Sequence, residues 1–428
     1  MNHKIRIQSI EINQIKNVGY GKVTFQDGNL VSTRGAGILG VFGQNGSGKT
    51  ALLDSLGLYR SLLSGQAINT DSGYLINLDQ KEAIVNITSA IHMRDEVYHV
   101  LYHFKLGFNA AHKVMILAEE LSYKNKTSKR YQSLLKAQYL SKMINLYCHH
   151  KPLVAIDPPK VARSTLFVSE IAHHLNGQER EIFDALVDYG KNHILIINQF
   201  SNRDIKTKHE FPLIYNVKTN GEVRSAMKIR YGVNYLSDDT LAVFKIIVAK
   251  ISLLLQHIVP GVELVYREGK TTKRGVQVEL VSKREDMMIP LQYESLGIKK
   301  LILILGSLIS MVNSDNVIVA IDEIDTGIFE YLLGEIFLVL KEEGKGQLLF
   351  TSHNLRPLEI LNPYQVVFTT ANPSSRYMSI KKTSKKLNLR DFYLRSIELG
   401  GQKENIYTAT DPYEISRAFH LAGHDDEK

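Results

Sequence analysis

A glycine-rich loop over residues 43–50 has the residue types and spacing needed to bind phosphate groups. Its glycines let successive backbone N–H groups turn inward, and a following helix would direct the positive end of its dipole to the same point. Lys49 is expected to reach the β- and γ-phosphates, and the Thr50 hydroxyl to ligate Mg²⁺. The pattern G-x-x-x-x-G-K-[ST] is completed by Gly43, Gln44, Asn45, Gly46, Ser47, Gly48, Lys49 and Thr50.

The segments on both sides are suited to hold this loop in place. The apolar run Ile38–Phe42 precedes it, and Ala51–Leu56 follows it. A strand before the turn and a helix after it distinguish a working phosphate-binding loop from a chance match. The alternative, a glycine-rich turn that binds nothing, is disfavoured because this context is present. The sequence therefore predicts binding of a nucleoside triphosphate with Mg²⁺.

A second candidate group is a pair of carboxylates at the end of an apolar run. The segment Val317–Ile321 leads directly into Asp322 and Glu323. A buried strand that ends in this way places Asp322 beside the phosphate-binding loop, where it can hold Mg²⁺ through water. Glu323 is then positioned to polarise the attacking water as a general base. Taken alone, the pair would also fit an ordinary strand end.

Two further segments offer ligands for a phosphate. Ser295 and Gly297 precede an apolar stretch, Leu301–Val312, and hydroxyl and amide donors at the start of a helix suit an anion. His353 follows the strand-like segment Gln347–Phe350, where it can hydrogen-bond the γ-phosphate. A lone histidine at a strand end is more often structural. Its position after the Asp–Glu strand, in a chain with a phosphate-binding loop, favours a functional role.

The composition indicates a folded chain without disulfides. Its 428 residues suffice for one large domain or two. With 44% apolar and 22% charged residues, it is typical of globular, soluble proteins. The single cysteine, Cys148, excludes an internal disulfide and fits a reducing cytosol. The formal net charge of +8 is a weak indication of a polyanionic partner.

We expect neither a membrane span nor secretion. The longest apolar run, Leu301–Val312, is too short to cross a bilayer. Residues 1–6 contain no apolar core of a secretory signal. The predicted location is the cytoplasm, with no membrane partner.

Short alternating runs predict a sheet around the loop. Turn-like residues separate the runs that follow the loop, and consecutive strands joined in this way favour an antiparallel arrangement. The strand candidates are Ile5–Ile10, Gly21–Phe25, Ala83–His92, Val97–Leu106 and His112–Leu117.

Residues 121–151 contain seven basic residues and no acidic ones, with tyrosines between them. One interpretation is a solvated, basic helical arm whose tyrosines pack on a neighbouring helix; the other is a surface that follows a nucleic-acid backbone. We favour the arm, because charge runs are usually solvated faces. The basic residues are Lys124, Lys126, Lys129, Arg130, Lys136, Lys142 and Lys151, and the tyrosines are Tyr123, Tyr131, Tyr139 and Tyr147.

The remaining segments complete the expected organisation. Helical patterns cover Val168–Gly190 and Leu241–His257, with the strand-like Ile194–Ile197 between them, and further strands are expected over 366–369 and 377–380. Because no low-complexity linker interrupts the middle of the chain, it is interpreted as an insertion inside one domain. A basic patch follows, formed by Lys381, Lys382, Lys385, Lys386 and Arg390.

The order of these motifs resembles the ABC-type ATPase heads of the SMC, Rad-fifty and RecF group. The long stretch of sequence between Thr50 and Ser295 is similar to that in the split heads of this group, in which an arm or lobe is inserted between the two halves. Within the group, the chain looks most like stand-alone ATPases of bacterial abortive-infection and overcoming-lysogenisation systems. Their signature resembles E-S-x-G-T-x-K-L, and their other motifs resemble D-E-h-D-x-x-h-H and T-x-H-N. The matching residues are Glu294, Ser295, Gly297, Lys299 or Lys300, Leu301, Asp322, Glu323, Asp325, Thr351, His353 and Asn354.

The likeness covers roughly residues 1–60 and 285–370 and includes departures from the family pattern. Only one glycine follows Ser295, Ile298 stands where relatives often have Thr, and Phe329 stands where many have His. These changes remove no catalytic group.

The resemblance implies an α/β fold: an ABC-type P-loop ATPase head with a mixed sheet, an antiparallel β-lobe and a helical insertion between loop and signature. It implies ATP and Mg²⁺ as cofactors, Thr50 and Asp322 at the metal, Ser295, Gly297 and Asp325 at the nucleotide, and Glu323 and His353 in catalysis. The expected division is 1–64 and 290–370 for the two parts of the head, 65–289 for the insertion, and 371–428 for a basic extension.

Three functions follow as alternatives. The first is an antiphage-defence ATPase that dimerises through ATP-sandwiched heads, or forms a higher homo-oligomer, and controls a separate effector, a nuclease or toxin. The second is a RecF-like repair or recombination clamp that binds nucleic acid. The third, a transporter ATPase subunit, is disfavoured by the missing L-S-G-G-Q glycine pair and by the large insertion.

Overall fold

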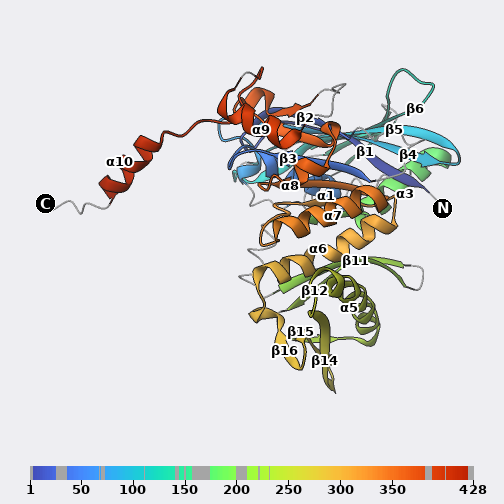
Figure 1. The fold of residues 1–428 in the computed structure, drawn as a ribbon. Coiled ribbons are helices and arrows are strands. Elements are labelled where there is room, and N and C mark those ends of the chain that lie inside the picture. The colour runs from blue at the N-terminus through green and yellow to red at the C-terminus, as the bar shows by residue number, and fades with distance from the viewer. Residues whose placement is uncertain are drawn as a thin grey trace.

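The computed structural model describes most of the chain, with its sheets and helices grouped in an upper body and a lower lobe (Figure 1). The described residues are 3–25, 36–66, 68, 73–109, 111–139, 144–148, 151–156, 174–198, 210–219, 222–230, 232–380, 388–400 and 402–422.

A six-stranded sheet carries the candidate chemistry. Its order is β10-β17-β18-β3-β19-β20, parallel except for the pairing of β20 with β19. Such strands are covered on both faces, which explains their continuous apolar runs. The strands are β3 (Gly37–Phe42), β10 (Ile194–Ile197), β17 (Ile318–Ile321), β18 (Gln347–Ser352), β19 (Val366–Thr369) and β20 (Tyr377–Ser379).

Alternate residues of these strands enter two separate apolar cores, as the two-residue period of a strand requires. Leu39 and Val41 of β3 face the core that contains helix α1 (Lys49–Leu63). Ile38 and Phe42 face the core that contains α6 (Leu296–Asn313) and α7 (Glu330–Glu343).

An eight-stranded antiparallel sheet lies on the same face of the six-stranded sheet as α1. It confirms the antiparallel pairing that was expected for the strands after the loop. Its order is β2-β1-β4-β5-β6-β7-β8-β9, and α3 (Gly177–Asn192) packs with α1 beside it. The strands are β1 (Lys4–Ile15), β2 (Val18–Thr24), β4 (Glu82–Met93), β5 (Glu96–Phe108), β6 (Val114–Asn125), β7 (Gln132–Tyr139), β8 (Ile144–Cys148) and β9 (Lys151–Ile156).

The expected basic helical arm over residues 121–151 is wrong, because the described part of this segment forms β6 to β9. Its side chains alternate with period two: Leu135, Ala137 and Tyr139 are buried, while Lys136 and Gln138 are half-buried. The charge run concealed this alternation. Lys142 lies outside the described residues.

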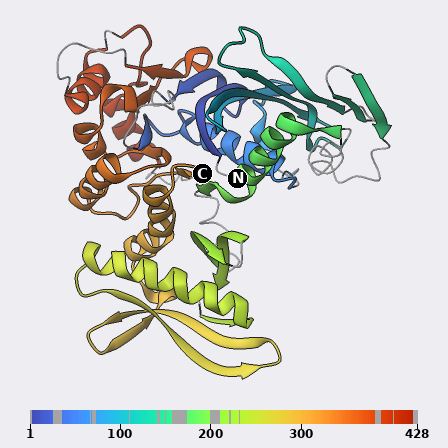
Figure 2. The same cartoon turned by 90° about the vertical axis from the view of Figure 1, so that its right-hand side faces the viewer.

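The lower lobe is formed by residues from the middle of the chain. Figure 2 shows the long hairpin of β14 and β15 below helix α5, which occupies the expected helical region. Its elements are β11 (Glu210–Thr219), β12 (Glu222–Arg230), β13 (Val233–Leu236), α5 (Asp238–Ile258), β14 (Glu263–Thr272), β15 (Gly275–Arg284) and β16 (Met287–Pro290).

The middle segment contributes to the body as well as to this lobe. Strands β4 to β9 extend the sheet of β1 and β2, and β10 pairs with β17 in the six-stranded sheet. The predicted domain boundaries themselves stay predictions.

The chain ends with α8 (Arg356–Ile360), α9 (Leu389–Glu398) and α10 (Pro412–Ala422). Of the expected basic patch, Arg390 lies in α9, and Lys381, Lys382, Lys385 and Lys386 lie outside the described residues. Among the described helices, α5 and α6 have the length and apolar composition of a membrane span, and 67% of the α6 window is buried inside the protein. Buried core helices meet the same criterion.

Candidate nucleotide-binding site

The phosphate-binding loop lies between the end of β3 and the start of α1, as predicted. Gly48 precedes the helix with a left-handed φ of 87°, which favours glycine. A Cβ at Gly43 would collide with the Thr369 side chain, whose hydroxyl donates to the Ser47 hydroxyl at 2.7 Å. The close approach of β19 therefore requires a glycine at the first position of the loop.

Lys49 is buried and folded back over this loop. Its Nζ donates to the Gly43 and Gln44 carbonyl oxygens, both at 2.9 Å, and the residue is 7% exposed. Burial lowers the pKa of Lys49, while the charges of Asp322 and Glu323 oppose that shift. The ammonium group is thus held at the mouth of the loop, where the β- and γ-phosphates are expected.

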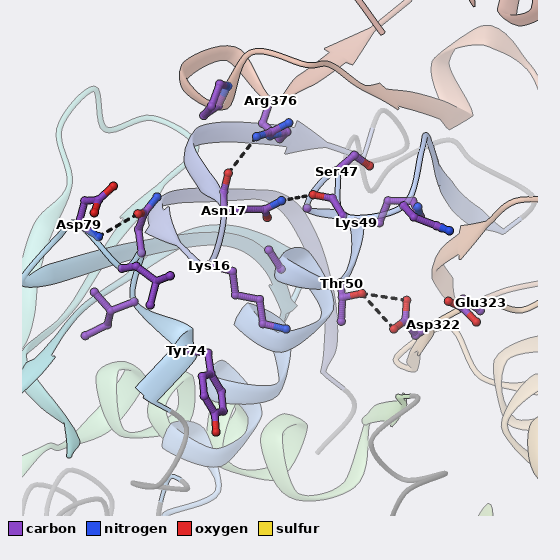
Figure 3. A pocket seen from close by; sticks show the side chains of 18 of the residues that line it. Lys16, Asn17, Ser47, Lys49, Thr50, Tyr74, Asp79, Asp322, Glu323 and Arg376 are labelled. Atoms are coloured by element: carbon purple, nitrogen blue, oxygen red, sulfur yellow. Dashed lines mark hydrogen bonds between the residues drawn. The ribbon is translucent and has the colours of Figure 1, made fainter. Parts of the chain in front are cut away.

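Thr50 and Asp322 meet in the structure, although 272 positions separate them in the chain. The Thr50 hydroxyl donates to Asp322 Oδ2 at 3.1 Å (Figure 3). The Thr351 hydroxyl donates to Oδ1 of the same carboxylate at 2.6 Å. Hydroxyl and carboxylate oxygens are hard ligands that suit Mg²⁺ together with phosphate and water. Among the described residues, no cluster of three or more His, Cys, Asp or Glu forms an alternative metal site.

Glu323 lines the same cavity in a constrained backbone conformation. Its φ is 46°, uncommon for a residue other than glycine. The Thr351 hydroxyl accepts the Glu323 N–H at 2.8 Å, and the Glu323 carboxylate accepts from the Thr326 hydroxyl at 3.1 Å. Thr351 therefore holds both carboxylate residues with one side chain.

The Asp325 side chain is hydrogen-bonded to the backbone of the segment that contains His353. The Asp325 carboxylate accepts the N–H groups of His353 at 3.2 Å and Asn354 at 3.0 Å. This places the His353 side chain on the cavity wall, while Asp325 is not one of the lining residues. Burial and the charge of Lys49 lower the pKa of His353, against the opposing effect of nearby carboxylates.

The cavity has a volume of about 870 Å³ and extends well beyond the loop. Its far wall includes the ion-paired Lys16 and the exposed Tyr74 and Leu78. Arg376 donates to the Asn17 carbonyl at 2.9 Å, and the Tyr377 hydroxyl donates to the Gly48 carbonyl at 2.8 Å. Figure 3 shows Arg376 and Asn17 on the opposite side of the loop from Asp322.

Sequence reasoning missed these wall residues and the role of Thr351. Thr351 stood in the T-x-H-N pattern, which was a signal that could have identified it. Arg376 and Tyr377 follow no motif of their own. Only the pairing of β19 with β3 and β20 brings them to the loop.

Ser295 lies apart from this cavity in the same chain. Its hydroxyl accepts the Ile298 N–H at 3.3 Å at the start of α6, and it is not among the lining residues. A Cβ at Gly297 would collide with the Gly327 carbonyl oxygen, so the start of α6 lies against the loop after Asp325. Lys300, buried one turn later, donates to the Asp322 carbonyl at 3.2 Å.

The structure thus brings together one group of predicted residues and separates another. Loop residues 45–50, Asp322, Glu323 and His353 surround one cavity, and Gly43 and Gln44 accept from Lys49. Ser295 and Gly297 stand on another part of the surface of this chain.

Comparison with known proteins finds likeness at the level of structure. No family model and no curated protein matches the chain. It resembles the SmcHead bound to the C-winged helix domain of ScpA, with 13% identity, a TM-score of 0.47 and coverage of 88% of this chain and 98% of that one. It also resembles the Smc head domain of Pyrococcus furiosus with an extended coiled coil, bound to the C-terminal domain of ScpA, with 10% identity, a TM-score of 0.45 and coverage of 88% and 96%.

The recombination mediator protein RecF with ATP is a further similar structure. It has 12% identity, a TM-score of 0.33 and coverage of 82% of this chain and 94% of that one. With TM-scores below 0.5, all three likenesses are partial, and function is inferred from the site itself.

Proposed function

We propose that the chain binds ATP with Mg²⁺, hydrolyses it to ADP and phosphate, and dimerises through the bound nucleotide. The observation that carries this proposal is the convergence of Lys49, Thr50, Asp322 and Glu323 on one cavity. These residues come from two distant segments, and each has the chemistry that its position in a phosphoryl-transfer site requires.

The roles follow from the contacts. The loop N–H groups and Lys49 bind and orient the phosphates, and Thr50 and Asp322 would hold Mg²⁺. The metal would neutralise charge that develops on the phosphate oxygens. Glu323 orients and deprotonates the attacking water, and His353 donates a hydrogen bond to the γ-phosphate.

The position of Ser295 supports a site shared by two copies. In one chain it faces solvent, away from the cavity that contains Lys49. In the proposed dimer, Ser295 of one copy meets the γ-phosphate held by Lys49 of the other. Donors that converge on the transferring group in this way are a main source of rate enhancement.

The test mixes two inactive chains, Lys49→Ala and Ser295→Arg. In a head-to-tail pair, one of the two sites contains an intact loop and an intact Ser295. Partial recovery of ATPase activity on mixing is therefore expected. Absence of recovery at every ratio, with both variants folded and dimeric, contradicts a shared site.

The proposed cellular role is a cytoplasmic sensor or scaffold in antiphage defence that controls a separate effector. It is supported by the likeness of the Glu294–Leu301 and Asp322–Asp325 patterns to the abortive-infection group, which is a resemblance of sequence only. The test challenges cells that carry this gene and its neighbour with phage. Protection that persists unchanged in the Lys49→Ala variant would contradict the role.

A second candidate is a RecF-like clamp on DNA, which is favoured by the turn between β6 and β7. Lys126, Lys129 and Arg130 are exposed there. If these residues follow a duplex, each phosphate they neutralise should contribute a log–log salt slope of roughly −0.9. Replacing the three residues by Glu should flatten the slope by up to about three units. Binding to purified DNA that is undetectable or independent of salt rules the clamp out.

A further inference from the structure

Helix α10 has an apolar stripe with no covering surface in the part of the chain that the structure describes. Each of its residues, 412–422, is exposed, and Figure 1 shows it standing off from the body at the left. Phe419 is 77% exposed. Ile415, Ala418, Phe419 and Ala422 have the i, i+3, i+4, i+7 spacing of a helix face that normally packs against an apolar surface.

A second exposed apolar surface surrounds Ser295. We call it the signature patch, and it consists of Tyr293, Leu296, Phe329 and Tyr331, which are 73%, 73%, 71% and 64% exposed. The Phe329 and Tyr331 rings are 5.7 Å apart, and the approach of Gly327 to the backbone of Leu296 and Gly297 joins the two halves. Contiguous exposed apolar residues of this kind mark an interaction site.

The segment that leads to α10 is anchored at the phosphate-binding loop. Asn405 accepts the Ala371 N–H at 2.6 Å, Ile406 is buried, and the Thr408 N–H donates to the Gln44 side chain at 3.0 Å. Four residues from Thr408 to Pro412 span at most about 14 Å, so α10 must begin close to the loop. Its eleven residues extend about 16 Å further.

We propose that α10 of one copy packs on the signature patch of a second copy when two heads close on ATP. This inference rests on the proposed function, because in the proposed dimer Ser295 of the second copy lies at the loop that anchors α10. The patch of the same chain surrounds a Ser295 that lies apart from that loop. A two-fold axis makes the exchange reciprocal, so that each dimer contains two identical contacts.

The patch that α10 contacts is assigned to a second copy for two reasons. Both surfaces belong to this chain, and the short segment from Thr408 to Pro412 limits where α10 can reach. Phe329 is part of this argument, because its apolar side chain is 71% exposed within the signature patch. An exposed phenylalanine in this patch provides a packing surface for an apolar helix.

The first test measures ATP-dependent dimerisation by sedimentation in the Glu323→Gln background, with and without Phe419→Glu. Because one buried phenylalanine is lost from each of two contacts, the dimer affinity should fall at least about a hundredfold. The matched control, His420→Glu, adds the same carboxylate on the opposite side of α10 and should leave the affinity unchanged. ATP binding to the single chain should be equal in all three proteins.

A second test identifies the occupant by cross-linking. Chains with only Ala418→Cys are mixed with chains that have only Tyr331→Cys, and a bifunctional thiol reagent is added with ATP; Cys148 is buried in the native fold. A cross-linked product that needs both chains and ATP is expected. A cross-link within a single doubly substituted chain, and none between chains, overturns exchange between copies.

Failure of this inference can be distinguished from failure of the proposed function. An ATP-dependent dimer whose affinity is unaffected by Phe419→Glu refutes the docking of α10 alone. If the Glu323→Gln chain forms no dimer with ATP, the shared site and the docking of α10 are both wrong.

Discussion

The loop half and the signature half of the proposed site differ in how complete they are within one chain. Around Lys49, polar groups are buried and paired: Asp322 is 3% exposed and accepts hydrogen bonds from Thr50 and Thr351. Around Ser295, apolar side chains such as Leu296 and Phe329 face solvent. Preorganised polar groups are what a single chain needs to bind nucleotide, whereas exposed apolar surface is what association requires.

The largest effects are expected when the loop half is broken. Glu323→Gln should reduce turnover by about 10²- to 10⁴-fold, because the general base is lost while the phosphate contacts remain. Lys49→Ala should lose ATP binding itself. Turnover and nucleotide affinity, measured separately, distinguish the two variants. Parental turnover in Glu323→Gln would mean that another carboxylate is the base.

Gly297→Ala is expected to break the signature half selectively. The new methyl group would meet the Gly327 carbonyl, and overpacking of this kind costs about 1–3 kcal/mol. ATPase activity should fall roughly tenfold or more through displacement of Ser295, while ATP binding to the single chain is kept. In the control, Gly57→Ala, the added Cβ meets only the Ile196 side chain at 3.7 Å. Equal loss of nucleotide affinity in Gly297→Ala would contradict nucleotide binding by the loop half alone.

Lys300 is a direct link between the halves, so Lys300→Met measures their coupling. Its Nζ donates from α6 to the Asp322 carbonyl, and burial lowers its pKa. Methionine keeps the packing but not the hydrogen bond, so a reduction of turnover by about tenfold is expected, at constant ATP affinity. The neighbouring Lys299→Met serves as control because Lys299 donates to the Gln292 carbonyl instead. Equal turnover in both variants would show that the link has no effect.

The smallest effect concerns pH. Because burial and the charge of Lys49 lower the pKa of His353, its imidazole is neutral at pH 7 and is protonated only below the ordinary value of about 6.5. Protonation adds a positive charge beside Lys49, so turnover should be constant from pH 7 to 8 and change only below that range. His353→Gln should remove the acidic change. If turnover of this variant still changes below pH 7 as in the parent, that change belongs to another titrating group.

Motif spacing predicted a strand before the phosphate-binding loop and a helix after it, and β3 and α1 confirm both. A phosphate-binding loop depends on glycine dihedrals and on its two flanking elements, all within about twenty consecutive residues. The strand before Asp322 and Glu323 was predicted from an apolar run, and β17 confirms it. Residues 121–151 failed because surface charge says little about helix or strand, and the alternation of Leu135, Ala137 and Tyr139 was the better indicator.

The sequence by itself determined which groups are able to do chemistry: the glycines of the loop, Lys49, Thr50 and the two carboxylates. Only the tertiary structure decided which of them meet. Thr351 holds Asp322 and Glu323 because β18 lies between β17 and β3. Ser295 lies apart from the loop of its own chain, at the start of α6 that packs against Gly327. Strand order and helix packing are set by contacts between distant segments, where burial of apolar faces outweighs any local preference.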